Sequence, residues 1–127
     1  YIKKEDLVDE IEFSKYEVEL QIISKKNNIE FSNNDLIKFF DYDKIEEGII
    51  IRNRKDGDKM VPIGMKGTKK LKDVFINSKI PKEIRNIIPI VCFDEKIAWV
   101  VGVKVSEQFK VTSNTKQILK ITFRERV

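Results

Sequence analysis

The chain has 127 residues, about the length of one domain, and its 41% apolar and 36% charged residues predict a folded core. It contains no histidine and one cysteine, which excludes Ser-His-Asp and Cys-His catalysis, histidine-ligated zinc, an internal disulfide and a four-cysteine metal site. What is left for chemistry is carboxylates, lysines, arginines and hydroxyls, and because no spacing among them nominates an acid/base pair we expect no catalytic residue and no metal ligand here. Cys92 lies in the apolar run 88–93, which is typical of a buried thiol.

The net charge of +4 is unevenly distributed. Residues 1–51 carry seven Lys/Arg and thirteen Asp/Glu, residues 52–85 carry eleven and four, and residues 86–127 carry seven and four. All three prolines lie within residues 57–89, so the basic third also has shaped turns. A charge block alone is typical of a solvated face, whereas basic residues held by fixed turns indicate a phosphate-binding surface.

The first forty residues are expected to form one strand and one short helix. Residues 17–23 alternate polar and apolar side chains, as a half-buried strand does. Residues 25–28 are expected to form a turn, and residues 29–31 are compatible with a further short strand. Asn34 and Asp35 can then cap a helical segment that runs to Phe40.

The basic third begins with the strongest strand pattern, at residues 48–54, and residues 55–58 form the turn behind it. Arg52 and Arg54 lie two residues apart and are expected on one face of this strand. Their guanidinium groups suit phosphate recognition. The alternative is that they form surface ion pairs with the carboxylates of the turn.

A loop at residues 62–68 follows, and two short helices come after it. Apolar residues at helical spacing from Leu71 predict the first helix, with Thr68 as its cap. Pro81 is expected at the first position of the second helix, which ends before Pro89.

The last third is rich in strands. Residues 90–93 and 97–103 are expected to pair as a hairpin around a turn at residues 94–96, and residues 118–123 form a final strand after a turn at residues 112–115. The fold class is therefore α+β, a mostly antiparallel or mixed β-sheet with two short helices inserted in the basic middle third.

The glycine loop and its lysines predict an anion site. Glycines permit close backbone approach to a ligand, and the loop is expected to open a helix whose first amides point outward. The loop matches neither a Walker A motif nor GxGxxG, which argues against an ATP site here. The predicted phosphate-binding residues are Arg52, Arg54, Lys66, Gly67, Lys69, Lys70, Lys72, Lys79 and Arg85.

Four segments carry a recognisable pattern. Residues 51–81 read IRNRKDGDKMVPIGMKGTKKLKDVFINSKIP, and IPIV at 88–91, WVVG at 99–102 and SEQFKV at 106–111 continue it. Together they resemble the C-terminal domain of bacterial tRNA(Ile)-lysidine synthetase over about residues 41–123. On this basis residues 46–127 are interpreted as a C-terminal tRNA-binding domain, and residues 1–45 as a linker or the end of a preceding domain.

The resemblance implies a parent ligase that uses ATP and magnesium to adenylate the wobble cytidine of tRNA(Ile) and then attaches L-lysine. In that family an N-terminal PP-loop domain of the same polypeptide holds the nucleotide, and the C-terminal domain contacts the acceptor stem. The Ser-Gly-Gly-x-Asp-Ser motif of that loop is absent from this sequence. The resemblance thus implies that this chain binds tRNA(Ile) and neither catalyses the reaction nor holds a cofactor.

Two further expectations concern location and assembly. No run approaches the roughly 18 apolar residues of a membrane span and no signal pattern is present, so we expect a cytoplasmic protein without membrane contact. The first residue is Tyr1 and not methionine, which favours a part of a longer protein. The alternative function is a structural scaffold without tRNA contact, in which the acidic first third docks on the basic third within one chain or across a homodimer.

Overall fold

The computed structural model describes residues 1–26 and 29–126. In chain order the elements are β1 (Ile2–Lys3), the 3-10 helix η1 (Lys4–Asp6), β2 (Glu10–Phe13), β3 (Tyr16–Ser24), β4 (Ile37–Asp41), the 3-10 helix η2 (Tyr42–Lys44), β5 (Gly48–Arg52), β6 (Lys59–Met60), β7 (Lys69–Lys70), α1 (Leu71–Asn77), α2 (Lys82–Arg85), β8 (Ile90–Phe93), β9 (Lys96–Val100), β10 (Lys104–Val105) and β11 (Gln117–Glu125).

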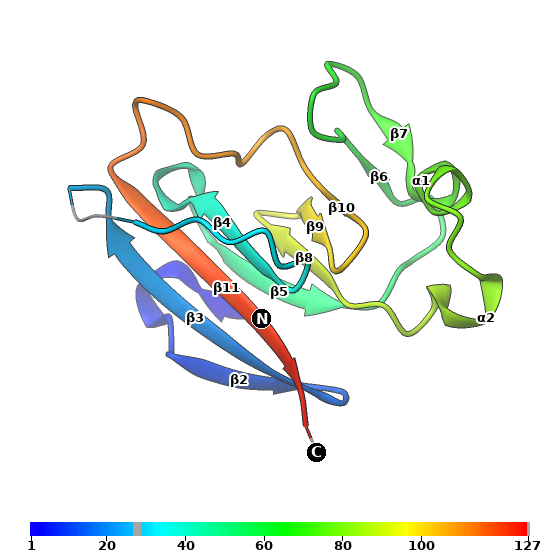
Figure 1. Cartoon of the computed structure of the whole chain (residues 1–127), viewed down its shortest axis with the longest axis horizontal. Coiled ribbons are helices and arrows are strands. Elements are labelled where there is room, and N and C mark those ends of the chain that lie inside the picture. The colour runs from blue at the N-terminus through cyan, green and yellow to red at the C-terminus, as the bar shows by residue number, and fades with distance from the viewer. Residues whose placement is uncertain (27–28, 127) are drawn as a thin grey trace.

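Two antiparallel sheets form the body of the protein (Figure 1). One has the strand order β1-β5-β8-β9-β10 and the other has the order β2-β3-β11-β4. Their facing sides share one apolar core, in which aromatic side chains from opposite sheets meet edge to face. The ring centroids of Phe40 and Phe93 lie 5.2 Å apart, and those of Trp99 and Phe123 lie 5.3 Å apart.

A third layer covers the other face of the five-stranded sheet. Leu71, Val74 and Phe75 of α1 belong to one buried cluster with Ile90 and Cys92 of β8. Strand β8 is consequently buried on both faces, which explains its uninterrupted apolar sequence. Figure 1 shows that α1, α2 and the two-stranded ribbon β6-β7 lie together at one end of the molecule, away from β2 and β3.

The predicted fold class is confirmed: the sheets are antiparallel and both helices lie in the basic third. The strand predicted at residues 48–54 appears as β5 but ends at Arg52, so the expectation that Arg52 and Arg54 share one face of it is wrong. The hairpin appears as β8 and β9, with β9 ending at Val100, and the last strand appears as β11. The alternation at residues 17–23 appears as β3, which pairs with β11 along nine residue pairs.

The helix predicted at residues 34–40 is wrong, because this segment contains strand β4. The Asn34 side-chain oxygen does accept a hydrogen bond, but from the amide of Leu36 at 2.8 Å, which closes a local turn. Pairing of β4 with β11 then places Phe40 in the core. Residues 29–31 are not in a strand, and residues 27–28 of the predicted turn lie outside the described residues.

The predicted helix starts also need correction. Thr68 does not cap α1, because strand β7 intervenes and Lys70 occupies the N-cap position without a side-chain hydrogen bond. The amide of Leu71, the first residue of α1, donates to the carbonyl of Asp58 at 2.9 Å. Pro81 is the N-cap residue of α2 and not its first helical residue.

The division of the chain at residue 45 stays a prediction about the longer protein. Within the described residues, strands β1 to β4 belong to the same two sheets as β5, β8, β9, β10 and β11. The acidic first third is therefore folded onto the last third through β3 and β11.

Candidate nucleic-acid interface

A cavity of about 470 Å³ opens at the end of the molecule that carries the helices. We call it the cation cavity. Its basic lining residues come from the β5–β6 turn, the ribbon β6-β7 and both helices, and they are Arg54, Lys55, Lys59, Lys70, Lys72, Lys82 and Arg85. Asp56, Gly57, Asp58 and Leu71 complete the lining. The basic residues outnumber the two carboxylates, so the cavity attracts anions.

Two arginines of the cation cavity are held in place by contacts that use only one edge of each guanidinium. Arg54 donates from Nε to Asn86 Oδ1 at 2.7 Å, and Arg85 donates from Nε to the carbonyl of Ile80 at 2.9 Å. Both guanidinium carbons lie over the ring of Phe75, at 5.6 and 5.9 Å from its centroid. These contacts orient the two forks before any ligand arrives and leave their Nη groups for a phosphate.

The third arginine, Arg52, serves the turn beside the cavity. Its Nη1 and Nη2 donate to the two carboxylate oxygens of Asp58 at 3.0 Å each, with only 17% and 11% of the two side chains exposed. The Lys55 amide also donates to Asp58, at 2.8 Å. Burial alone would raise the pKa of Asp58, but these hydrogen bonds outweigh it and hold the pKa below its usual value. Of the two alternatives predicted for these arginines, Arg52 forms an ion pair with a carboxylate of the turn, whereas Arg54 lines the cavity.

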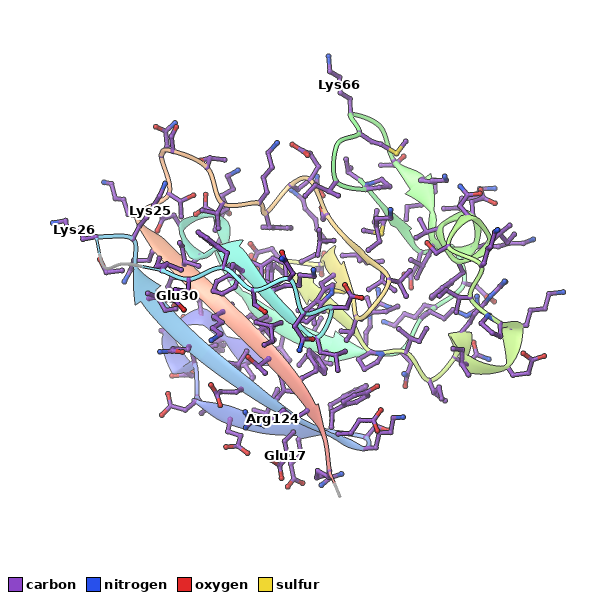
Figure 2. The ribbon with its side chains drawn as sticks, viewed as in Figure 1. Glu17, Lys25, Lys26, Glu30, Lys66 and Arg124 are labelled. Carbon is purple, nitrogen blue, oxygen red and sulfur yellow. The ribbon has the colours of Figure 1, made fainter. Side chains whose placement is uncertain are left out.

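The structure brings some of the predicted phosphate-binding residues together and separates others. Arg54, Lys70, Lys72 and Arg85 line the cation cavity. Lys66, Gly67, Lys69 and Lys79 do not belong to its lining. Figure 2 shows Lys66 at the tip of the β6–β7 loop, pointing away from the body.

The glycine loop is not the start of a helix. It connects β6 to β7, and its base is tied to the segment after β10 by a bridge between Pro62 and Ser106. The Glu107 carboxylate accepts from the Gly64 amide at 2.9 Å and pairs with Lys110. Hydrogen bonds from Lys110 and Gly64 lower the pKa of Glu107. The loop is thus fixed by neighbouring residues, and strand β7 separates it from α1, so the predicted junction of loop and helix is wrong, while anion binding at Lys66, Gly67 and Lys69 stays a prediction.

Sequence reasoning left three cavity lysines out of the predicted site. Lys55 and Lys59 flank the turn after β5, and Lys82 stands in the first turn of α2. Lys59 could have been predicted as a cavity residue from strand pairing, since it lies opposite Lys70 in the ribbon β6-β7. Lys55 could not be predicted from the sequence, because its place in the cavity depends on the turn that contains Gly57, at a φ of +84°, facing the helices.

The acidic first third pairs elsewhere. In the described part of the chain, Glu12 pairs with Arg126 at 2.9 Å and Glu19 pairs with Arg124 at 3.1 Å. These are contacts with the last third, at the end of the molecule where Figure 2 shows Glu17 and Arg124. Ion pairs with Arg124 and Arg126 thus offset part of the negative charge of β2 and β3, whereas basic side chains gather around the cation cavity.

Residues 1–26 and 29–126 offer neither a metal-binding cluster nor a membrane-spanning helix. No cluster of three or more Cys, Asp or Glu residues has the arrangement of a metal site there. No helix in this part combines the length and apolar character needed to cross a membrane. Phe75 and Trp99 have 0% exposure, as expected of core residues.

The comparisons with known proteins agree with this fold. The family model described as "TilS substrate C-terminal domain" matches residues 49–122, more than half of the chain. The chain belongs to this TilS C-terminal domain family. A crystal structure described as that of a TILS C-terminal domain is similar at a TM-score of 0.74 and 26% identity, covering 89% of this chain and 86% of that one.

Curated relatives of the TilS family are longer. A tRNA(Ile)-lysidine synthase of Clostridium perfringens is 57% identical over 106 residues, which make up 84% of this chain and 22% of that protein. The synthase of Clostridium tetani is 46% identical over 108 residues, 85% of this chain and 23% of that protein. The chain thus spans less than a quarter of their length. An N-terminal fragment of a phenylalanyl-tRNA synthetase β-subunit from Pyrococcus horikoshii shares the fold at a TM-score of 0.59 and 21% identity, covering 72% of this chain and 28% of that one.

Proposed function

We propose that this chain binds tRNA through the cation cavity, as the C-terminal part of an enzyme that modifies tRNA(Ile). The observation that carries the proposal is the convergence of seven cations from separate elements on one cavity. Phosphate contacts of this kind supply most of the affinity of a protein for nucleic acid. Arg54 and Arg85 provide oriented forks, and the lysines provide mobile charges around them.

The substrate is proposed to be the acceptor stem of tRNA(Ile). A-form RNA has a deep, narrow major groove that side chains do not read, so proteins recognise it through its backbone and shape. A cavity lined by cations, with neighbouring helices that fix its outline, suits that mode of recognition. Strands β2 and β3 lie at the other end of the molecule, so the positive charge of the cation cavity orients the RNA toward the end that carries the helices.

The chemistry is proposed to belong to the preceding part of the longer protein. The names of the curated relatives support a tRNA(Ile)-lysidine synthase. From the family resemblance we further propose that ATP drives the joining of lysine to the tRNA. In this arrangement the present chain grips the tRNA while a PP-loop domain of the same polypeptide holds the nucleotide. We place the protein in the cytoplasm, where tRNA is modified.

The rival function is a scaffold or homodimer contact without RNA. The described ion pairs of Glu12 and Glu19 favour the RNA-binding function, because they join the first third to the last third and leave the cation cavity to another partner. Sedimentation of the chain without tRNA distinguishes docking between two copies from RNA binding.

The test is a comparison of two charge-reversal variants. The first replaces the cavity residues Lys55, Lys70 and Lys72 with glutamate. The matched control replaces Lys26, Lys96 and Lys116, which are also exposed and lie outside the cavity. Both change the net charge by the same amount, so any difference in tRNA affinity reports position and not total charge.

We expect the cavity variant to bind tRNA(Ile) at least about 100-fold more weakly at fixed salt, and the control variant to bind within about threefold of the unaltered chain. Circular dichroism and thermal unfolding check that both variants fold. Equal losses in the two variants, or no loss in either, would contradict the proposal. Sedimentation of the unaltered chain without tRNA tests the rival function through its oligomeric state.

A further inference from the structure

A second groove, of about 280 Å³, runs beside strand β4 at the edge of the four-stranded sheet. We call it the aromatic groove, and its principal lining residues are Phe31, Lys38, Phe39, Ile63, Val105 and Lys110. Among the described residues, no carboxylate belongs to its lining. The groove therefore combines apolar walls with positive charge.

Its outer wall is an exposed aromatic side chain that is held in position. Phe31 is 59% exposed, yet its ring meets that of Phe39 edge to face, with centroids 4.9 Å apart. Two bonds shape the loop that carries it, from the Asn34 amide to Ser32 Oγ at 3.1 Å and from the Leu36 amide to Asn34 at 2.8 Å. Ile63 is also exposed and lines the same groove, so the two side chains form an apolar patch of the kind that marks an interaction site.

Cations surround these rings. Lys120 Nζ lies 5.8 Å from the centroid of Phe39, and Lys38 and Lys110 line the groove itself. Lys110 also pairs with Glu107, which fixes its position. Aromatic rings interleaved with lysines are the pattern by which proteins hold single-stranded nucleic acid, since each base has a face to stack and each phosphate a charge to neutralise.

The aromatic groove and the cation cavity share no lining residue, but the ribbon β6-β7 and its loop reach both of them. Ile63 of the β6–β7 loop lines the groove, while Lys59 and Lys70, on the two strands that this loop joins, line the cavity. The bond between Glu107 and Gly64 ties the loop to the segment that includes Lys110. An RNA seated on the cavity is therefore adjacent to the groove.

We propose that the aromatic groove binds an unpaired nucleotide of the same RNA, the single-stranded end that extends beyond the acceptor stem. This inference rests on the proposed function of the cation cavity. No carboxylate belongs to the described groove lining, and Lys38 and Lys120 bring positive charge to its rings, while the charge of Lys110 is shared with Glu107. This balance favours an anionic occupant over an apolar peptide. The base contacts Phe31 and Phe39, and the adjoining phosphate contacts the lysines.

The experiment compares two transcripts of tRNA(Ile), one with its unpaired 3′ nucleotides and one that ends flush with the acceptor stem. The unaltered chain is expected to bind the flush transcript about tenfold more weakly, the effect of one lost stacking contact. Phe31→Ala should weaken binding of the tailed transcript to the same level and leave the flush transcript unaffected. Phe31→Tyr should retain the preference. Ile87→Ala, which removes an exposed apolar side chain outside the groove, should also retain it.

A fluorescence readout gives independent evidence. In a Phe31→Trp variant the new indole is exposed while Trp99 is fully buried, so quenching by the tailed transcript and not by the flush one is expected. Equal affinity of the unaltered chain for both transcripts would overturn the groove proposal and leave the cavity proposal standing. If the unaltered chain shows no salt-dependent binding of either transcript, both the groove proposal and the cavity proposal are overturned. If the emission of the introduced indole is already shifted to the blue in the RNA-free longer protein, the groove proposal is also overturned, because a protein segment then fills the groove.

Discussion

Arg52 and Asp58 form a two-point ion pair, with both Nη atoms 3.0 Å from the two carboxylate oxygens, across the turn that borders the cation cavity. The Asp58 carbonyl accepts from the Leu71 amide at 2.9 Å, so the same residue fixes the turn and the start of α1. The pair thereby positions Lys55 and Leu71, which both line the cavity.

Replacing Asp58 with asparagine should destabilise the fold by about 1–3 kcal/mol, because the half-buried Arg52 loses its charged partner. Urea unfolding at pH 7 measures this change. Asp56→Asn is the control, since its side chain is exposed and outside this pair, and it should stay within about 0.5 kcal/mol. If Asp58→Asn leaves the free energy of unfolding unchanged, the Arg52–Asp58 pair does not stabilise the turn.

Acid should weaken a second carboxylate contact. The Asp94 side chain accepts from the amides of Glu46, Glu47 and Gly48 at 2.7, 2.7 and 3.1 Å. Burial opposes this ionised state, but the three amide donors outweigh burial and lower the pKa of Asp94. The stabilisation is therefore complete above the unfolded pKa of about 3.9 and disappears as pH falls through the lower folded value.

Asp94→Asn should accordingly reduce the free energy of unfolding by about 1 kcal/mol at pH 7 and by much less near pH 2. Asparagine tolerates the positive φ of 52° at this position, so backbone strain does not confuse the result. Denaturant unfolding across pH 2 to 7 makes the comparison. An identical loss at both ends of this range would show that ionisation of Asp94 contributes nothing.

Gly48 is required by the close approach of β1. A methyl group there would collide with the carbonyl oxygen of Ile2 and lie 2.8 Å from the Tyr1 hydroxyl oxygen. We expect Gly48→Ala to separate β1 from β5 and to cost about 1–3 kcal/mol. Gly67→Ala is the control, because nothing lies within 4 Å of the added methyl, and unchanged thermal stability is expected. Equal stability of the two variants would place β1 away from β5.

The salt dependence of tRNA binding should count the cavity contacts. Each phosphate contact contributes about 0.7 to 0.9 to the slope of log affinity against log salt. Lys70→Gln and Lys72→Gln should each reduce the slope by about that amount, whereas Lys26→Gln should leave it unchanged. The slope is measured by titrating tRNA at several salt concentrations. Slopes that fall equally in all three variants would indicate diffuse attraction without a defined site.

Much of the fold follows from local pattern. The β-branched runs that became β5 and β8, and the alternation that became β3, are determined by residues close in sequence. Helix α1 appears where its apolar spacing places it, whereas α2 ends at Arg85, earlier than the expected end before Pro89. Residues 34–40 show where local signals fail. An asparagine that can cap a helix can equally close a turn. Pairing with β11, about eighty residues later in the chain, favours the strand β4 over a helix here.

The candidate site was predictable in part for a similar reason. Lys70, Lys72 and Arg85 stand in an obviously basic segment, but the cavity is assembled by tertiary packing of a turn, a ribbon and two helices. For this reason Lys55 lines the cavity although it was not predicted, and Lys66 does not line it although it was predicted. The sequence pattern kept two alternatives for Arg52, and only the geometry shows that its partner is Asp58.

Lysine footprinting tests the central claim most directly. The chain is acetylated with and without saturating tRNA(Ile), and the modification of each lysine is read by mass spectrometry. The account predicts that tRNA protects the cavity lysines, which are Lys55, Lys59, Lys70, Lys72 and Lys82, and leaves Lys26, Lys96 and Lys116 as reactive as in the free chain. Protection of the second group, with the cavity lysines unchanged, would contradict it.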